Sequence, residues 1–134
     1  MRRNALAYIL GIAVTMLTIM LVQALGHAIY PVDTNVDVQD GQLNAEYMAE
    51  LPVGAILFVA IAWAVGVLAG NAAAVRIGNL RPVYFSSVIT SFVLAGAVTQ
   101  MILIPHPTWF IPVSLLGIIA AGAASCFLPA RHAS

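Results

Sequence analysis

Four long stretches without Asp, Glu, Lys or Arg constrain this chain more than any other feature of its sequence. They cover residues 5–32, 51–75, 82–104 and 108–130. Each exceeds the roughly 20 residues with which an α-helix crosses about 30 Å of hydrocarbon. None shows the polar stripe of a helix that covers a soluble core. The stretches predict an all-α integral membrane four-helix bundle, a single transmembrane domain over residues 1–134. The expected spans lie near residues 5–29, 52–75, 82–104 and 108–129, with an outer loop over 30–51.

The composition excludes several classes of protein. Only 7% of the residues are charged and 62% are hydrophobic, whereas about a quarter of a soluble domain is charged. The glycines of "GVLAGNAAAVRIG" lie in an apolar span, so they do not predict a phosphate-binding loop and no nucleotide partner is expected. The five arginines are scattered over three segments, which excludes a basic face for nucleic acid. The single cysteine, Cys126, is interpreted as a small apolar filler.

The charged residues predict the orientation of the chain in the membrane. Loops rich in Lys and Arg stay on the cytoplasmic side. The arginines place both termini and the loop between spans two and three in the cytoplasm, and the outer loop on the outside. The protein is expected in the plasma membrane, the inner membrane of a bacterium. All five acids, Asp33, Asp37, Asp40, Glu46 and Glu50, lie in that outer loop, and the arginines are Arg2, Arg3, Arg76, Arg81 and Arg131.

The first span has an alternative interpretation as a secretory signal. It begins with a basic segment and carries a small-residue site at residues 24–26. Its apolar run is longer than the roughly 7–15 residues of a signal core, which favours a retained span. Cleavage would leave the orientation of the other three spans unchanged.

Small residues recur every four positions in each span and form a narrow face, here called its seam. Lipid is as apolar as leucine, so membrane helices associate through close backbone approach and interhelical hydrogen bonds. We expect Gly66 and Gly70 to face other helices of the same chain, with a homodimer face as the alternative. Asn71 is expected to form an interhelical hydrogen bond. The seams are Ala7, Gly11 and Thr15; Ala62, Gly66, Gly70 and Ala74; Ser87, Ser91, Ala95 and Thr99; and Gly117, Ala121 and Ser125.

Uncharged polar residues gather at the outer ends of spans one and three. Gln23 and His27 lie one turn apart, and Gln100 is followed by His106 in the short break "PHP". At about 1.5 Å per residue, both glutamines lie roughly 6–9 Å below the outer boundary. The prolines end one span, begin the next and restrict the position of His106. We expect the two histidine side chains to lie within about 10 Å of each other.

The outer loop is expected to place two carboxylates above this layer. Leu43, Tyr47 and Leu51 form an apolar stripe, which predicts a short amphipathic helix on the membrane surface. Glu46 and Glu50 lie one turn apart on it, a spacing at which partly buried carboxylates can share a proton or a cation.

Two hypotheses hold for these polar residues. In the first, water and lipid head groups satisfy each side chain and the residues have no joint role. In the second, they form a ligand-binding site for a metal, a quinone or a lipid. His27 and His106 would be the metal ligands, although the sequence has no HExxH motif, His-x-x-x-His pair or cysteine cluster. The candidate residues are Gln23, His27, Glu46, Glu50, Gln100 and His106.

Three functional classes compete. An ion pump or proton-coupled transporter is disfavoured, because the middle of each span lacks ionisable residues. A structural or accessory subunit, packed against another membrane subunit or a second copy, needs only the seams and the lipid bilayer. The short loops and the lack of a soluble domain favour this class. The alternative is a binding or catalytic site at the outer face. Whether the protein is an enzyme, and with which cofactor, stays open at this point.

The segments "GHAIYPVD", "ELPVGAILFVAIAWAVGVLAGNAAA" and "LIPHPTWF" resemble those of small uncharacterised bacterial four-span membrane proteins. The resemblance covers most of the chain. It implies a four-span architecture, no activity and no catalytic residues.

Overall fold

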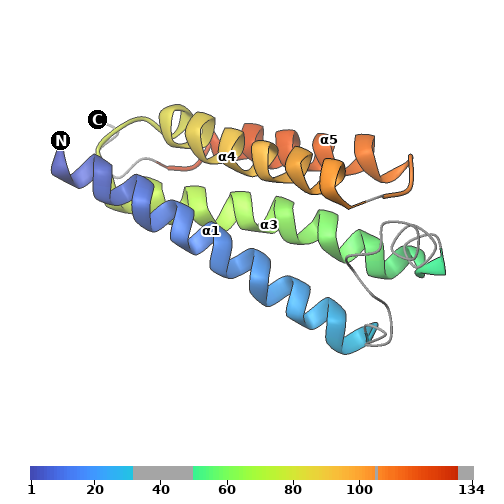
Figure 1. Ribbon diagram of the computed structural model, residues 1–134. Helices are drawn as coiled ribbons and strands as arrows, with labels where there is room; N and C mark the ends of the chain where they lie inside the picture. Colours follow the sequence, from blue (N-terminus) through green and yellow to red (C-terminus); the bar gives the residue numbers. More distant parts are fainter. Residues whose placement is uncertain (32–49, 105, 130–134) are drawn as a thin grey trace.

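The computed structural model describes residues 1–31, 50–104 and 106–129, and within these ranges the chain folds into four α-helices. They are α1 (Arg2–Ile29), α3 (Val53–Ile77), α4 (Pro82–Leu103) and α5 (Phe110–Ser125). The helices pack side by side as an elongated bundle (Figure 1). The prediction of an all-helical fold is confirmed. The expected surface helix lies mainly in residues 32–49, outside the described residues.

Three helices are long and apolar enough to cross a membrane, and they indicate a membrane protein. They are α1 with 28 residues, α3 with 25 and α4 with 22. At about 1.5 Å per residue, even α4 reaches about 33 Å. Pro52 stands at the N-cap of α3 and Pro82 in the first turn of α4, where a missing N–H leaves no hydrogen bond unmade.

The fourth helix is shorter than expected, since α5 has 16 residues whereas the predicted span covers 108–129. Before it, the chain turns, with the N–H of Phe110 bonded to the carbonyl of Pro107 at 3.0 Å. After it, the N–H groups of residues 126–128 each bond three residues back, which is the tighter 3₁₀ pattern. The α-helical part reaches about 24 Å, and the three turn residues add about 6 Å.

The central helix of the bundle is α3. It packs against α1 on one side and against α5 and α4 on the other, whereas α1 and α4 touch little (Figure 1). All four seam residues of α3 are buried, and so are Ala7, Gly11 and Thr15 on α1. The two seams therefore meet each other.

Gly66 and Gly70 are the points of closest approach between α3 and α1. A Cβ on Gly66 would lie 2.6 Å from Cγ1 of Ile19, and one on Gly70 would lie 2.6 Å from the carbonyl oxygen of Gly11. A Cβ on Gly70 would also overlap the hydroxyl of Thr15, which donates to the Gly11 carbonyl at 2.8 Å. Because only glycine permits this approach, both positions face a helix of the same chain.

The structure overturns the expected seam of α4, and part of the seam of α5. The α4 seam, residues 87, 91, 95 and 99, is exposed, and a Cβ on Gly117 would meet nothing within 4 Å. The hydroxyls of Ser87, Ser91 and Thr99 donate to carbonyls four residues earlier in α4, so they need no partner helix. The bundle instead buries the larger side chains of α4. Its buried face consists of Phe85, Ser86, Ile89, Val93 and Ala97.

A single hydroxyl joins α4 to α5. Ser86 donates to the carbonyl of Gly122 at 2.6 Å. A Cβ on Gly122 would lie 2.5 Å from Oγ1 of Thr90, so this glycine permits close approach in the second helix pair as well. The α4–α5 contact therefore combines a small residue with an interhelical hydrogen bond.

Asn71 contradicts its prediction. Its side chain is fully buried in α3, and neither polar atom of its carboxamide has a hydrogen-bond partner among the described residues. The buried hydroxyls of Thr15 and Ser125 donate to carbonyls within their own helices. A buried amide without a partner costs about 1–3 kcal/mol in protein mutational data.

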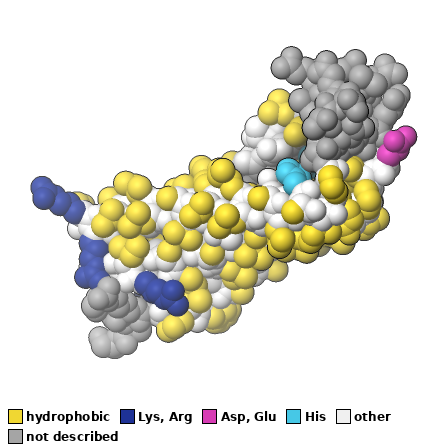
Figure 2. Space-filling model, turned by 90° about the horizontal axis from the view of Figure 1, so that it is seen from below, with side chains coloured by type: hydrophobic (Ala, Val, Ile, Leu, Met, Phe, Trp, Pro, Cys, Tyr) yellow, Lys and Arg dark blue, Asp and Glu magenta, His cyan; other side chains and the backbone are white. Residues whose placement is uncertain are grey.

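Charged residues lie at the ends of the bundle. Figure 2 shows arginines at one end, and histidine and an acidic side chain toward the other. We call the first the arginine end (Arg2, Arg3, Arg76 and Arg81) and the second the histidine end (Gln23, His27, Gln100 and His106). At the arginine end, Nε of Arg3 donates to the carbonyl of Ile77 at 2.6 Å. The N–H of Asn79 donates to Oδ1 of Asn4 at 2.8 Å.

Candidate functional site

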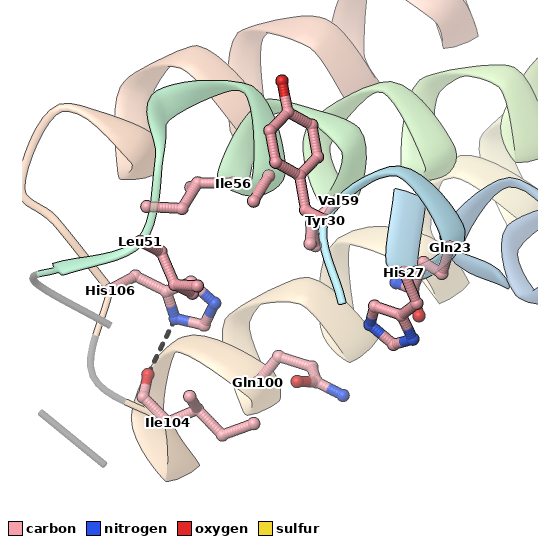
Figure 3. Close-up of a pocket in the computed structure, with 10 residues that line it drawn as sticks. Gln23, His27, Tyr30, Leu51, Ile56, Val59, Gln100, Ile104 and His106 are labelled. Carbon is pink, nitrogen blue, oxygen red and sulfur yellow. Dashed lines mark hydrogen bonds between the residues drawn. The ribbon is translucent and has the colours of Figure 1, made fainter. Parts of the chain in front are cut away.

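A cavity of about 220 Å³ lies at the histidine end, between α1, the start of α3 and the end of α4 (Figure 3). It brings together both glutamines and both histidines that the sequence pattern singled out. The hydrophobic residues around it are contributed mainly by α3. The lining residues are Gln23, His27, Tyr30, Leu51, Ala55, Ile56, Val59, Gln100, Ile104 and His106.

The end of α1 supplies one side of the cavity. Gln23 and His27 are one turn apart, so their side chains leave the same face of the helix. The helix ends at Ile29, two residues before Pro31, whose ring disfavours helical geometry in the residue that precedes it. Tyr30 then packs edge-on against Phe58 with centroids 6.2 Å apart. Its hydroxyl lies over Gly54, where a Cβ would collide with it, so this hydroxyl is held against α3.

The end of α4 supplies the opposite side. The N–H of Ile104 bonds to the carbonyl of Gln100 at 2.8 Å, which closes the last turn. Ile104 itself is extended, with φ −122° and ψ 124°, the geometry favoured for a residue that precedes proline. This bend turns the Ile104 carbonyl away from the helix ladder, and His106 bonds to it.

His106 is the most constrained polar side chain of the site. Its Nδ1 is 2.7 Å from the Ile104 carbonyl oxygen. Its ring stacks on Phe110, with centroids 4.7 Å apart and planes inclined by 13°. Burial lowers the pKa of His106 below its ordinary value of 6.5, and the hydrogen bond to Ile104 opposes this shift. The histidine between two prolines is therefore a half-buried group with a fixed orientation.

The described lining of the cavity has polar side chains but no Asp, Glu, Lys or Arg. Its polar groups are mainly imidazoles and carboxamides, and Leu51, Ala55, Ile56, Val59 and Ile104 form its apolar wall. Glu50 is exposed and does not line it, and Glu46 lies outside the described residues. No group of three or more His, Cys, Asp or Glu side chains within the described ranges could hold a metal ion. The described lining therefore suits an uncharged ligand better than a metal ion.

Sequence reasoning missed the apolar wall and the place of Tyr30. Ala55 and Val59 lie one turn apart, and Ile56 is adjacent. Because these residue types occur throughout the span, nothing in the pattern distinguishes lining positions from lipid-facing ones. Tyr30 is three residues after His27, a helical spacing that would have connected it to the polar layer.

The fold and the described lining define an α-helical membrane protein with a cavity of polar and apolar side chains at one end of the bundle. No protein-family model matches the chain, and neither a curated protein nor a solved structure is similar to it. The function is therefore argued from the site itself.

Proposed function

We propose that the protein is a four-span membrane protein that binds an uncharged amphiphile, a quinone or a neutral lipid, at the histidine end. The observation that supports this is the composition of the cavity wall: two imidazoles and two carboxamides face an apolar surface, and the described lining has no charged side chain. Ligand pockets of this kind hold an apolar body and orient it with a few polar groups.

The size of the cavity agrees with a ring or a lipid head group. An engineered protein cavity of about 150 Å³ holds benzene, so a cavity of about 220 Å³ has room for a substituted six-membered ring. The tail of such a ligand would extend along the apolar side chains of the bundle into lipid. Gln23 and Gln100, at matching depth, would hydrogen-bond its oxygen atoms.

The test is ligand-induced stabilisation of the purified protein in nanodiscs. We expect a short-tailed quinone couple or a diacylglycerol to raise the melting temperature, since saturation at 100 times Kd adds about 2.7 kcal/mol. Ala55→Leu fills the cavity and should abolish this stabilisation. Ala24→Leu, an exposed position of α1 outside the lining, should retain it. Equal responses of the two variants, or no response to any of these ligands, would refute the proposed site.

The orientation belongs to the same proposal. The arginine end faces the cytoplasm and the histidine end faces outward in a bacterial inner membrane, because arginine-rich loops stay inside. Reporter fusions at Gly78 and Ser134 should report the cytoplasm, and a fusion at Asp37 should report the outside. An external signal at Ser134 would overturn this orientation and the assignment of α5 as the fourth span.

A second candidate is a structural or accessory subunit. The exposed seam of α4 favours it, because residues 87, 91, 95 and 99 are small and face away from the bundle. A helix of another subunit or of a second copy would approach this face closely. Under this hypothesis Ser91→Leu changes the size of the complex in native gels, whereas Ala55→Leu does not. An unchanged complex in Ser91→Leu would exclude association through this face.

A further inference from the structure

The hydrogen bond between His106 and Ile104 fixes where the imidazole carries its proton. A backbone carbonyl oxygen only accepts hydrogen bonds. Nδ1 of His106, 2.7 Å from the Ile104 oxygen, is therefore the donor. In the neutral ring Nε2 then has a lone pair and accepts. Figure 3 shows this second nitrogen turned away from Ile104 toward the space between the lining residues.

Aromatic packing holds the ring in this orientation. Phe110, on which His106 stacks, is itself fully buried. Trp63 of α3 packs edge-on against Phe110, with centroids 5.6 Å apart. Reversing the imidazole would break the bond to Ile104 and leave its carbonyl oxygen without this partner. The fold therefore orients Nε2 of His106 as an acceptor in the absence of a ligand.

The charge state of the His106 ring agrees with Nε2 being a hydrogen-bond acceptor. Burial disfavours the imidazolium form and lowers the pKa of His106, so the neutral ring predominates at neutral pH. Among the described lining residues, the titratable groups across the cavity are His27 and Tyr30, both from α1. The lining contributed by α3 and α4 has no titratable side chain, and α5 presents Phe110.

We propose that His106 makes the cavity selective for the hydroxyl-bearing form of its ligand, so that a hydroquinone or an alcohol lipid binds better than the matching quinone or ester. This inference rests on the proposed function. A hydroxyl donates to the lone pair of Nε2, whereas a carbonyl or ester oxygen meets it with a second lone pair and leaves the acceptor of this half-buried ring unpaired. An unmade hydrogen bond of this kind lowers affinity by roughly 10- to 100-fold.

Two matched pairs of probes separate the sources of the hydroxyl. The first is one short-tailed quinone, measured oxidised and, under anaerobic conditions with reductant, reduced. The second is a diacylglycerol and its acetate ester. We expect the wild-type protein in nanodiscs to bind the hydroxyl member of at least one pair at least tenfold more tightly. The pair that shows the difference identifies the ligand as a quinol or a lipid alcohol.

His106→Asn tests the role of the acceptor. The asparagine amide can still donate to the Ile104 carbonyl but lacks the second ring nitrogen. We expect the preference to disappear through weaker binding of the hydroxyl probe, with the affinity of the carbonyl or ester probe unchanged. Ala24→Leu, at an exposed position of α1 outside the described lining, is the control and should keep the preference.

The outcomes distinguish this inference from the function on which it rests. Equal binding of both members in both pairs overturns the selectivity and leaves the binding site intact, whereas no binding of any probe also refutes the proposed function. Nitrogen NMR of histidine-labelled wild-type protein provides a check without mutation. A proton on Nε2 and none on Nδ1 at neutral pH would overturn the inference.

Discussion

The hydroxyl of Thr15 in α1 occupies the place that a Cβ on Gly70 of α3 would take. The same hydroxyl donates to the carbonyl of Gly11, so α1 presents a compact surface of its own backbone and one short side chain to α3. Helices in lipid depend on such close contact for their association. The contact between residues 15 and 70 is therefore a sensitive place to test the packing.

Gly70→Ala should destabilise the protein, because the added methyl group pushes α1 and α3 apart. Overpacking of this kind costs about 1–3 kcal/mol, which corresponds to a melting temperature lower by at least about 3 °C. Gly96→Ala is the matched control, since a Cβ there meets nothing within 4 Å, and alanine favours the helix by about 1 kcal/mol. Equal melting temperatures of the two variants in detergent would contradict the observed seam.

Asn71→Leu should stabilise the protein. The replacement has the same branching and number of side-chain heavy atoms and removes two buried polar atoms that have no partner among the described residues, a gain of about 1–3 kcal/mol. Asn4→Leu should act in the opposite direction, because Asn4 accepts a hydrogen bond from the N–H of Asn79. Thermal unfolding of both variants measures the difference. A lower melting temperature for Asn71→Leu would show that the amide is hydrogen-bonded after all.

The side chains of His27 and His106 should lie within about 10 Å of each other, the reach of direct or water-bridged contact. Both line the same cavity (Figure 3). Cysteines at these two positions, in a Cys126→Ser background, should be joined by a bifunctional thiol reagent of about that length. Cysteines at positions 27 and 120 provide the control, because Ala120 lies on the exposed face of α5. Failure to join the first pair would contradict a shared site and support the hypothesis that water and lipid head groups satisfy each histidine separately.

The preference for hydroxyl probes should depend on pH in one direction. The folded pKa of His106 lies below 6.5 because of burial, so above that value the ring is neutral and Nε2 accepts. As the pH falls through the lowered pKa, Nε2 gains a proton and becomes a donor. The hydroxyl probe then loses its partner and the carbonyl probe gains one. We expect the affinity ratio to decline and reverse as the pH is lowered below 6.5 and through the lowered pKa of His106, in wild type and in His27→Asn. A constant ratio would contradict the assigned role of His106.

The axial positions of residues could be predicted from the sequence, whereas the rotation of some helices could not. Hydrophobic length fixes where a helix starts and ends along the membrane normal, and this is why Gln23 and Gln100 lie on one cavity. The prediction for the seam of α3 is also correct, because Gly66 and Gly70 permit the close approach of the α1 backbone to this face of α3. For α4, both candidate faces consist of apolar and small residues, so hydropathy does not decide which one is buried.

The finer features of the site depend on backbone geometry. The direction of the Ile104 carbonyl decides which nitrogen of His106 faces the cavity. The proline after Ile104 favours its extended geometry, but the hydrogen bond to His106 appears only in the structure. Glu50 was expected to join the site but is exposed and does not line the cavity. A carboxylate gains more from water than from an uncharged cavity wall. The position of Glu46 lies outside the described residues.

Two helix pairs of the bundle each have a glycine contact: Gly70 between α1 and α3, and Gly122 between α4 and α5. Trp63 and Phe110 pack together where the pairs meet. Ribosomes deliver the chain from its N-terminus, so the first pair can associate while the second is still being synthesised. The cavity draws its walls from both pairs. A nascent chain that stops before α4 therefore has a helix hairpin without Gln100, Ile104 and His106, and under the proposed function it lacks one side of the binding site.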